Sequence, residues 1–138
     1  MPEARFEVVD GLIIVPVVVW GPKGAARRFR FVLDTGTART ILSERTASML
    51  GFTPSDATRP SRVASILGAE LGSVVVVPRI HSLGWERDDF EVACHGFDPD
   101  AQVAGLLGGD FFARMRLVID YGTGMIEVSK STGVRAPD

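Results

Sequence analysis

Cysteine is almost absent from this 138-residue sequence, and the single Cys94 has no partner for an internal disulfide. Long apolar runs are missing too: the longest, Leu12 to Trp20, is interrupted by Pro16 and falls short of the roughly 20 residues that a membrane helix requires. Neither charge predominates, since 15 basic and 17 acidic residues leave a formal net charge of -2. We therefore expect no disulfide scaffold, and neither a membrane nor a nucleic acid as a partner.

Metal-binding spacing is lacking as well. Cys94, His95 and His81 do not form the paired pattern of a zinc site. A Cys–His nucleophile pair is disfavoured, because adjacent residues of a strand point to opposite faces. The glycine-rich stretch from residue 105 to residue 109 lacks the Lys-Ser/Thr ending of a phosphate-binding loop. We expect no metal and no organic cofactor.

The start of the sequence carries no recognisable targeting signal. The first seven residues, Met-Pro-Glu-Ala-Arg-Phe-Glu, do not place basic residues before an apolar core. The lone Cys94 agrees with this, since extracellular domains of this size often carry paired cysteines. These observations predict a cytoplasmic location.

What the sequence does contain is typical of a compact β-rich protein. Hydrophobic residues make up 46% of the chain, and there are 15 glycines and 8 prolines. A chain of 138 residues is long enough to bury a substantial core in one domain. We therefore expect a single domain over residues 1 to 138, with a polar tail from about residue 131 to residue 138.

Alternating and β-branched runs predict a series of short strands, and the dipeptide Asp10-Gly11 predicts a hairpin between the first two. A turn is expected at residues 21 to 24, and loops at residues 52 to 61 and around Trp85, Asp88 and Asp89. The expected strands are Phe6–Val9, Leu12–Trp20, Arg27–Leu33, Thr40–Leu42, Arg62–Leu67, Leu71–Val77, Ile80–Leu83, Phe90–Ala93, Leu117–Asp120 and Met125–Val128.

Two short helices are predicted. Ser43 is a candidate N-cap for a helix from Glu44 to about Leu50, which Gly51 would close. Asp110 is expected to cap a second helix across residues 111 to 115. In this interpretation Asp110 is a helix cap and has no catalytic role.

The most informative feature is the triplet Asp34-Thr35-Gly36, which directly follows the apolar run Phe29–Leu33. About seventy residues later the chain reads Val-Ala-Gly-Leu-Leu-Gly-Gly-Asp-Phe-Phe from residue 103 to residue 112. A triplet of this kind occurs by chance in a few per cent of chains of this length, roughly. The two segments together, in this order, carry the interpretation.

These segments resemble those of the retropepsin-like aspartic proteases. That family pairs an apolar-apolar-Asp-Thr-Gly-Ala/Ser loop with a later apolar-Leu-Gly-x-Asp/Asn-apolar segment, which folds beside the first loop. The resemblance covers roughly residues 6 to 129. It implies an all-β, closed, β-barrel-like acid protease fold with one or two short helices and a flap hairpin, which functions as a homodimer.

Hydrolysis by this mechanism needs two carboxylates that share one proton. One of them takes a proton from the attacking water, and the other donates a hydrogen bond to the developing oxyanion. The chain has one such triplet, and the nearest imitation, Asp120-Tyr121-Gly122, places an aromatic ring where a small hydroxyl residue belongs. We therefore expect the second Asp34 to come from a second copy of the chain, across a two-fold axis.

The resemblance also implies roles for individual residues in an aspartic endopeptidase that cuts extended polypeptide segments. Asp34, Thr35 and Gly36 form the catalytic set: the Thr35 hydroxyl bonds to the partner loop, and Gly36 leaves room for the substrate backbone. A hairpin around Gly68-Ala69-Glu70, with its tip near Leu67 and Gly68, is the flap. The residues assigned to substrate binding are Thr37, Leu67, Gly68, Ala69 and Leu107.

Some positions depart from the family pattern. Retroviral members pair an acidic residue after the triplet with an arginine in the second segment, and Ala38 and Gly109 occupy those positions here. Thr37 replaces the usual Ala or Ser. Two other interpretations stay open: a non-catalytic peptide-binding or dimerisation module with the same fold, and an unrelated β-barrel. The cluster Arg27, Arg28 and Arg30 fits a basic binding site or solvated strand positions.

Overall fold

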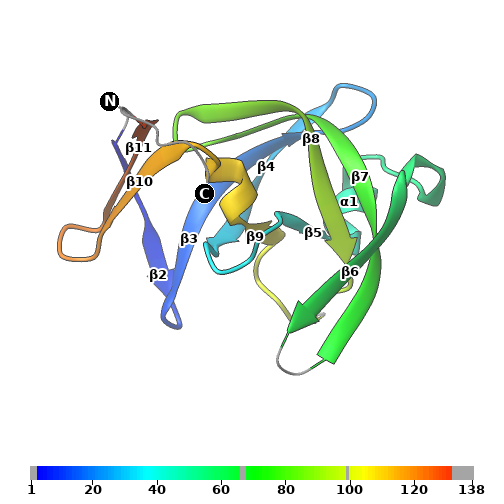
Figure 1. Cartoon of the computed structure of the whole chain (residues 1–138), viewed down its shortest axis with the longest axis horizontal. Helices are drawn as coiled ribbons and strands as arrows, with labels where there is room; N and C mark the ends of the chain where they lie inside the picture. Colours follow the sequence, from blue (N-terminus) through cyan, green and yellow to red (C-terminus); the bar gives the residue numbers. More distant parts are fainter. Residues whose placement is uncertain (1–2, 66–67, 99, 132–138) are drawn as a thin grey trace, which may run out of the picture.

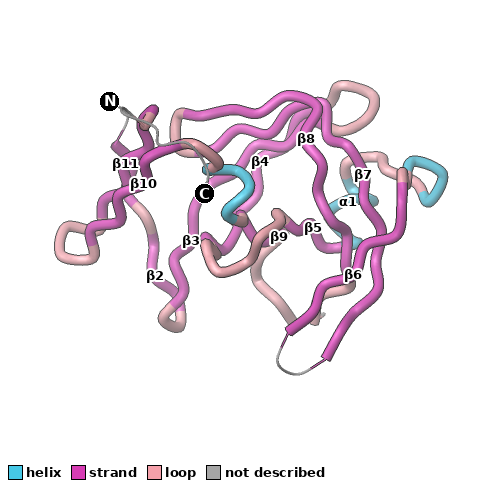
Figure 2. The backbone as a smooth tube through the Cα atoms, viewed as in Figure 1, coloured by secondary structure: helices cyan, strands magenta, loops and turns pink. Residues whose placement is uncertain are grey.

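The computed structural model describes residues 3–65, 68–98 and 100–131. Strands dominate it, as Figure 2 shows, and the described residues also form one α-helix and two 3-10 turns. No helix among the described residues is long and apolar enough to span a membrane. The elements are β1 (Glu3–Arg5), β2 (Glu7–Val9), β3 (Leu12–Trp20), β4 (Ala26–Leu33), β5 (Ile41–Ser43), α1 (Glu44–Met49), η1 (Pro54–Asp56), β6 (Arg59–Ser65), β7 (Gly68–Ser82), β8 (Trp85–His95), β9 (Gly105–Leu107), η2 (Gly109–Phe112), β10 (Met115–Asp120) and β11 (Met125–Lys130).

The strands form two sheets. The larger has the order β2-β3-β4-β9-β5-β8-β7-β6, and an additional pairing of β3 with β7 closes six of these strands into a ring. The smaller sheet, β1-β11-β10, lies at the left of Figure 1. The prediction of an all-β protein is confirmed.

Alternating burial along the strands builds the core inside the ring. In β3 the side chains of Val15, Val17 and Val19 are fully buried, as expected for a strand whose successive residues face opposite sides. They pack with Phe31 from β4 and Phe111 from η2. Each such side chain contributes about 1.5–3 kcal/mol on burial. The catalytic-loop candidate therefore follows a strand that is firmly held in the core.

Two tight hairpins share one turn geometry. Asp10 and Gly11 have φ values of 51° and 79°, and Leu83 and Gly84 have φ values of 55° and 77°. Positive φ at both central residues is the turn that matches the twist of paired strands. The first hairpin is confirmed as predicted. The second was missed, because leucine is an unusual residue at a positive φ.

The second hairpin corrects the expected polar loop. Trp85, Asp88 and Asp89 belong to the continuous strand β8, which pairs with β7. Of the expected separate strand Ile80–Leu83, residues 80 to 82 belong to β7 and Leu83 lies in the turn. Pro78 interrupts the ladder opposite Asp89 without ending the strand, since only its own N–H is missing.

The first helix follows its predicted signals. The Ser43 hydroxyl accepts the Thr46 N–H at 3.0 Å, which is an N-cap. At the other end Gly51 has a φ of 95°, its N–H donates to the Ser48 carbonyl, and Phe52 N–H donates to the Ala47 carbonyl. This pair of hydrogen bonds is a Schellman cap.

The β6–β7 hairpin projects from the lower right of Figure 1, and its boundaries correct the prediction. β6 begins at Arg59, inside the expected loop, and contains Pro60. Because β6 pairs only with β7, it is an edge strand, where a proline is tolerated. Gly68 and Ala69 pair with the facing strand, so they are not turn residues. Leu67 and the tail beyond residue 131 lie outside the described residues.

Candidate active site

Asp34 stands at the point where β4 leaves the core. Its N–H donates to the Leu107 carbonyl at 2.9 Å, which continues the parallel pairing of β4 with β9. Its Oδ1 accepts the Gly36 N–H at 3.1 Å, and its carbonyl accepts the Thr37 N–H at 3.2 Å. Asp34 is half-buried, whereas Thr35 and Gly36 are exposed. The tight turn therefore fixes the carboxylate at the protein surface.

The glycine-rich segment passes directly behind this loop. Gly109 N–H donates to the Thr37 carbonyl at 2.9 Å, and Gly108 N–H donates to Thr40 Oγ1 at 3.1 Å. A Cβ at Gly108 would lie 2.7 Å from the Arg39 carbonyl carbon, closer than any side chain tolerates. The lack of a Cβ at Gly108 therefore lets the two backbones approach closely. A Cβ at Gly109, by contrast, would meet nothing closer than 3.6 Å.

Asp110 performs a different task from the predicted one. The residue that caps the short 3-10 turn η2 is Gly108, and the turn ends before Arg114, whose φ is 65°. The Asp110 carboxylate instead reaches across to Thr40: it accepts the Thr40 N–H at 2.9 and 3.0 Å and the Thr40 hydroxyl at 2.8 Å. It also accepts the Phe111 N–H at 2.9 Å.

This contact closes the far end of the Asp34 loop. Thr40 is fully buried, so its N–H and hydroxyl have no access to water. Its carbonyl accepts the Ala93 N–H from β8 at 3.0 Å, which ties the loop to a second strand. Asp110 is therefore a loop anchor. Sequence reasoning missed the partner because Thr40 lies 70 residues away in the chain.

The predicted substrate-binding residues are only partly brought together. Thr37 is half-buried beside Asp34, and its hydroxyl donates to the Arg39 carbonyl at 3.3 Å. Leu107 is fully buried, which corrects its assignment: its side chain packs in the core, and its carbonyl serves the site by holding Asp34. Gly68 and Ala69 are the first two residues of β7. Among the described residues, no hydrogen bond joins this hairpin to the Asp34 loop.

The other candidate groups have structural surroundings. Asp120 Oδ1 accepts the N–H groups of Gly122 and Thr123 at 2.9 and 3.1 Å, so this second Asp-x-Gly triplet forms an exposed turn between β10 and β11. Burial, aided by the nearby Glu44 carboxylate, raises the pKa of the Cys94 thiol to about 11. A thiol with such a pKa is a poor nucleophile at neutral pH. In the described part of the chain, no three His, Cys, Asp or Glu side chains gather as a metal site would need.

One chain thus presents one firmly held carboxylate, preceded by a core strand and braced by a distant glycine-rich segment. This combination of fold and loop is the one expected for aspartyl proteases with a single Asp-Thr-Gly triplet per chain. A family model described as aspartyl protease matches residues 15–111, which include both segments. The chain belongs to this family, and its fold is retropepsin-like.

The fold comparison agrees. The crystal structure of a retropepsin-like aspartic protease from Rickettsia conorii superposes with a TM-score of 0.66 at 18% sequence identity, and the match covers 92% of each chain. At that identity the likeness concerns the fold. The comparison with curated proteins found no match.

Proposed function

We propose that the protein is an aspartic endopeptidase that works as a homodimer and hydrolyses peptide bonds in extended polypeptide segments. The observation that carries this proposal is the geometry of Asp34. Its carboxylate is fixed by the Gly36 N–H on an exposed turn, and that turn is braced by residues 107 to 110. A catalytic acid must be held in place in this way while staying open to substrate.

The chemistry requires a second carboxylate. Two Asp34 side chains at hydrogen-bond distance cannot both be ionised, so they share one proton. The ionised carboxylate accepts a proton from water as the water attacks the scissile carbonyl. The protonated one donates its hydrogen bond to the oxyanion and later returns the proton to the leaving amine.

The homodimer supplies that second carboxylate. Thr35 and Gly36 are exposed in the isolated chain, and among the described residues the Thr35 hydroxyl has no hydrogen-bond partner. Both features suit a loop that meets its own copy across a two-fold axis. The family ion pair is absent, because Ala38 and Gly109 carry no charge, so the interface rests on hydrogen bonds and apolar contacts.

The substrate is expected to lie as an added strand between the Asp34 loop and the β6–β7 hairpin. Thr37 forms part of the floor beside the carboxylate. Gly68, Ala69 and Leu67 belong to the hairpin that we assign as the flap, and the absence of a Cβ at Gly68 permits close approach of a peptide backbone. In Figure 1 the adjoining ends of β6 and β7 lie at the bottom of the view, and the loop between β4 and β5 lies above and to the left of them.

We also propose a cytoplasmic location, where thiols stay reduced. Cys94 is buried, and no second cysteine is present to pair with it. This part of the proposal is independent of the catalytic mechanism.

The test is a cleavage assay on a diverse peptide mixture from acid to neutral pH, with Asp34→Asn as the matched control. The amide has nearly the shape of the carboxylate but cannot ionise or share the proton. We expect cleavage by the parent, none by the variant, and equal sedimentation of both as dimers. Cleavage by Asp34→Asn at the parent rate would end the proposal.

The alternative is a module that keeps the fold and binds peptides without turnover. It predicts that a peptide-mimicking aspartic protease inhibitor binds, while no peptide is cut at any pH by either form. The intact Asp34-Thr35-Gly36 triplet favours the enzyme.

A further inference from the structure

Arg87 directs its guanidinium group at main-chain carbonyls. It is a half-buried residue of β8, and its backbone pairs with Ile80 of β7. Its Nε donates to the Phe111 carbonyl at 3.0 Å, and its Nη2 donates to the Ala113 carbonyl at 2.7 Å. Among the described residues Arg87 forms no ion pair with a carboxylate. The positive charge of Arg87 therefore serves two backbone acceptors.

Both acceptors lie at the end of the 3-10 turn η2. This turn runs from Gly109 to Phe112, and Ala113 follows as its C-cap residue. The last carbonyls of a helical turn lack donors within the turn, so they take partners from elsewhere in the protein. A hydrogen bond from a charged donor is about twice as strong as a neutral one. Two such bonds from one guanidinium fix the end of η2 relative to β8.

A second side chain of β8 holds η2 from its apolar side. The Phe90 ring meets the Phe111 ring edge-on, with 6.3 Å between the ring centroids. Phe111 is fully buried and belongs to the hydrophobic core. The strand therefore holds the turn through one polar and one apolar contact, and Arg87 makes the polar one.

The turn η2 carries two anchors of the Asp34 loop. The Gly109 N–H donates to the Thr37 carbonyl at 2.9 Å, which holds the middle of the loop. The Asp110 carboxylate accepts the N–H and the hydroxyl of Thr40, which holds its far end. Because both anchors belong to one short turn, a shift of η2 moves them together. The position of the loop therefore depends on what holds η2.

We propose that Arg87 is a positioning residue, which holds η2 and thereby fixes the Asp34 loop. Its effect on catalysis rests on the proposed function, whereas its hold on the loop does not. The positions where retroviral members carry a charged pair, Ala38 and Gly109, are uncharged in this chain. Arg87 brings a charged contact to the second segment from a different strand.

The hold on the loop is tested by amide hydrogen exchange in Arg87→Ala, which needs no cleavage. The variant removes both donors from η2, and the loss of a hydrogen bond to a charged group corresponds to about a tenfold change in an equilibrium constant. We expect the Thr40 and Gly109 amides to exchange about tenfold faster, while the Thr46 amide at the start of α1 is unchanged. Exchange of Thr40 and Gly109 at the parent rate would overturn the proposal.

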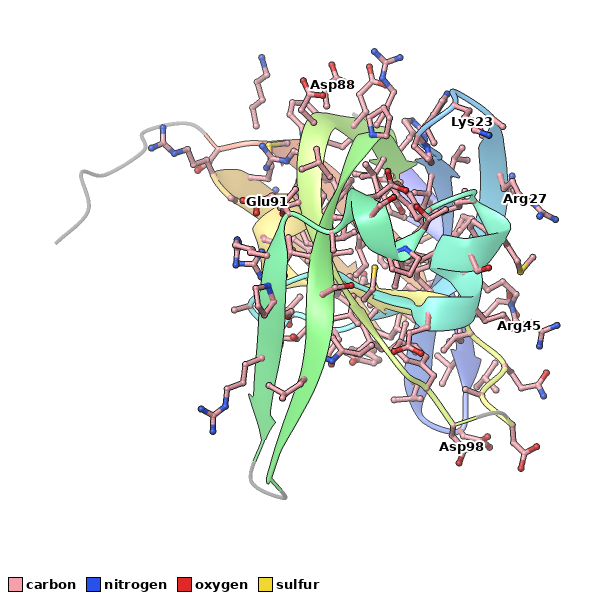
Figure 3. The ribbon with its side chains drawn as sticks, turned by 90° about the vertical axis from the view of Figure 1, so that its right-hand side faces the viewer. Lys23, Arg27, Arg45, Asp88, Glu91 and Asp98 are labelled. Atoms are coloured by element: carbon pink, nitrogen blue, oxygen red, sulfur yellow. The ribbon has the colours of Figure 1, made fainter. Side chains whose placement is uncertain are left out.

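Arg79→Ala is the matched control. Arg79 lies on the other strand of the β7–β8 hairpin, but it pairs with Asp88 at 2.7 Å and with Glu86 at 3.6 Å. This pair is at the surface, and Figure 3 shows Asp88 at the top of the view. Losing an exposed ion pair costs little, so exchange at Thr40 and Gly109 should stay within about twofold of the parent. Equal acceleration in both variants would contradict a specific role for Arg87.

Arg87→Lys covers the case in which the alanine variant does not fold. Lysine keeps the positive charge but lacks the planar fork that reaches two carbonyls at once. We expect its Thr40 amide to exchange at a rate between those of the parent and Arg87→Ala. A rate equal to the parent's would show that the charge alone is sufficient, and would refute the contact with two carbonyls as the cause.

A double-mutant cycle tests the route through Asp110. In Asp110→Asn the anchor of Thr40 is already weakened, so adding Arg87→Ala should raise the Thr40 exchange rate by less than about threefold. A further tenfold rise would show that the two residues act independently, and the proposed route would be wrong.

The effect on catalysis is measured separately, on protein that sediments as a dimer. A displaced carboxylate alters the transition state more than substrate binding, so Arg87→Ala should lower kcat about tenfold with KM within about twofold. Arg79→Ala should keep both values. An unchanged kcat beside faster Thr40 exchange would refute the link to catalysis. If the parent protein cuts no peptide, the proposed function fails, and the exchange rates alone decide whether Arg87 holds the loop.

Discussion

Replacing Asp110 with alanine should destabilise the protein more than any other single change on its surface loops. The substitution removes the acceptor for two donors of Thr40, its N–H and its hydroxyl, and Thr40 is fully buried. A buried donor left without a partner costs about 1–3 kcal/mol. Two such donors give a loss of about 4 kcal/mol, which is a large part of the 5–15 kcal/mol typical of a domain.

The assay is urea denaturation at fixed protein concentration, followed by tryptophan fluorescence. With a slope of about 2 kcal/mol per molar urea, a loss of about 4 kcal/mol lowers the midpoint by about 2 M at unchanged slope. Asp110→Asn keeps one acceptor oxygen but turns an amide group toward the Thr40 donors. It should therefore fall about halfway between the parent and the alanine variant.

Asp120→Ala is the matched control, because Asp120 also accepts two backbone N–H groups but lies in an exposed turn. Water can replace its carboxylate, so the midpoint should move by less than about 0.5 M. If Asp110→Ala moved the midpoint no more than Asp120→Ala, the Asp110 contact would not anchor the loop. The Asp34 loop would then owe its position to the glycine-rich segment alone.

Three further outcomes are expected. Gly108→Ala should lower the free energy of unfolding by about 1–3 kcal/mol in a urea titration, since the new Cβ meets the Arg39 backbone. Gly109→Ala should be nearly neutral, and equal effects of the two changes would contradict the close approach at Gly108. Burial raises the pKa of Cys94 from 9.0 to about 11, so between these pH values the folded thiol keeps its proton while the unfolded one loses it. The free energy of unfolding should therefore decline as pH rises from about 9 to 11, and in Cys94→Ala it should stay flat over that range. Thr35→Ala should weaken the dimer at every salt concentration in sedimentation, while the parent dimer holds or tightens as salt rises; steep dissociation with salt would show that charges hold the protomers.

The sequence was sufficient wherever a local signal decides the structure. Asp10-Gly11 set the first hairpin, and Ser43 with Gly51 set the ends of α1, because turn and cap residues act within a few positions of themselves. The Asp34 triplet was found because its residue types are constrained by chemistry. Its partner segment was found through the resemblance, and the structure places the two segments side by side.

Tertiary context decided the rest. Pro60 lies in a strand because β6 is an edge, which composition does not reveal. The polar residues Asp88 and Asp89 lie in a strand because β8 is held by β7 along its length, and Arg79 pairs with Asp88 at 2.7 Å. Leu107 was assigned to substrate binding from its place in the second segment, but its side chain is buried, since β9 runs through the middle of the large sheet.

The contacts around Asp34 explain why a single chain holds the loop in place yet lacks the second carboxylate of the proposed site. Everything that positions the loop comes from within the chain: the Leu107 carbonyl, the Gly109 N–H and the Asp110 carboxylate. The groups that face outward, Thr35 and Gly36, are exposed. In the proposed dimer the shared proton arises only when a second carboxylate lies beside the first. In the proposed homodimer the rigid loop serves association first and catalysis through it, because two copies meet with their carboxylates already in place.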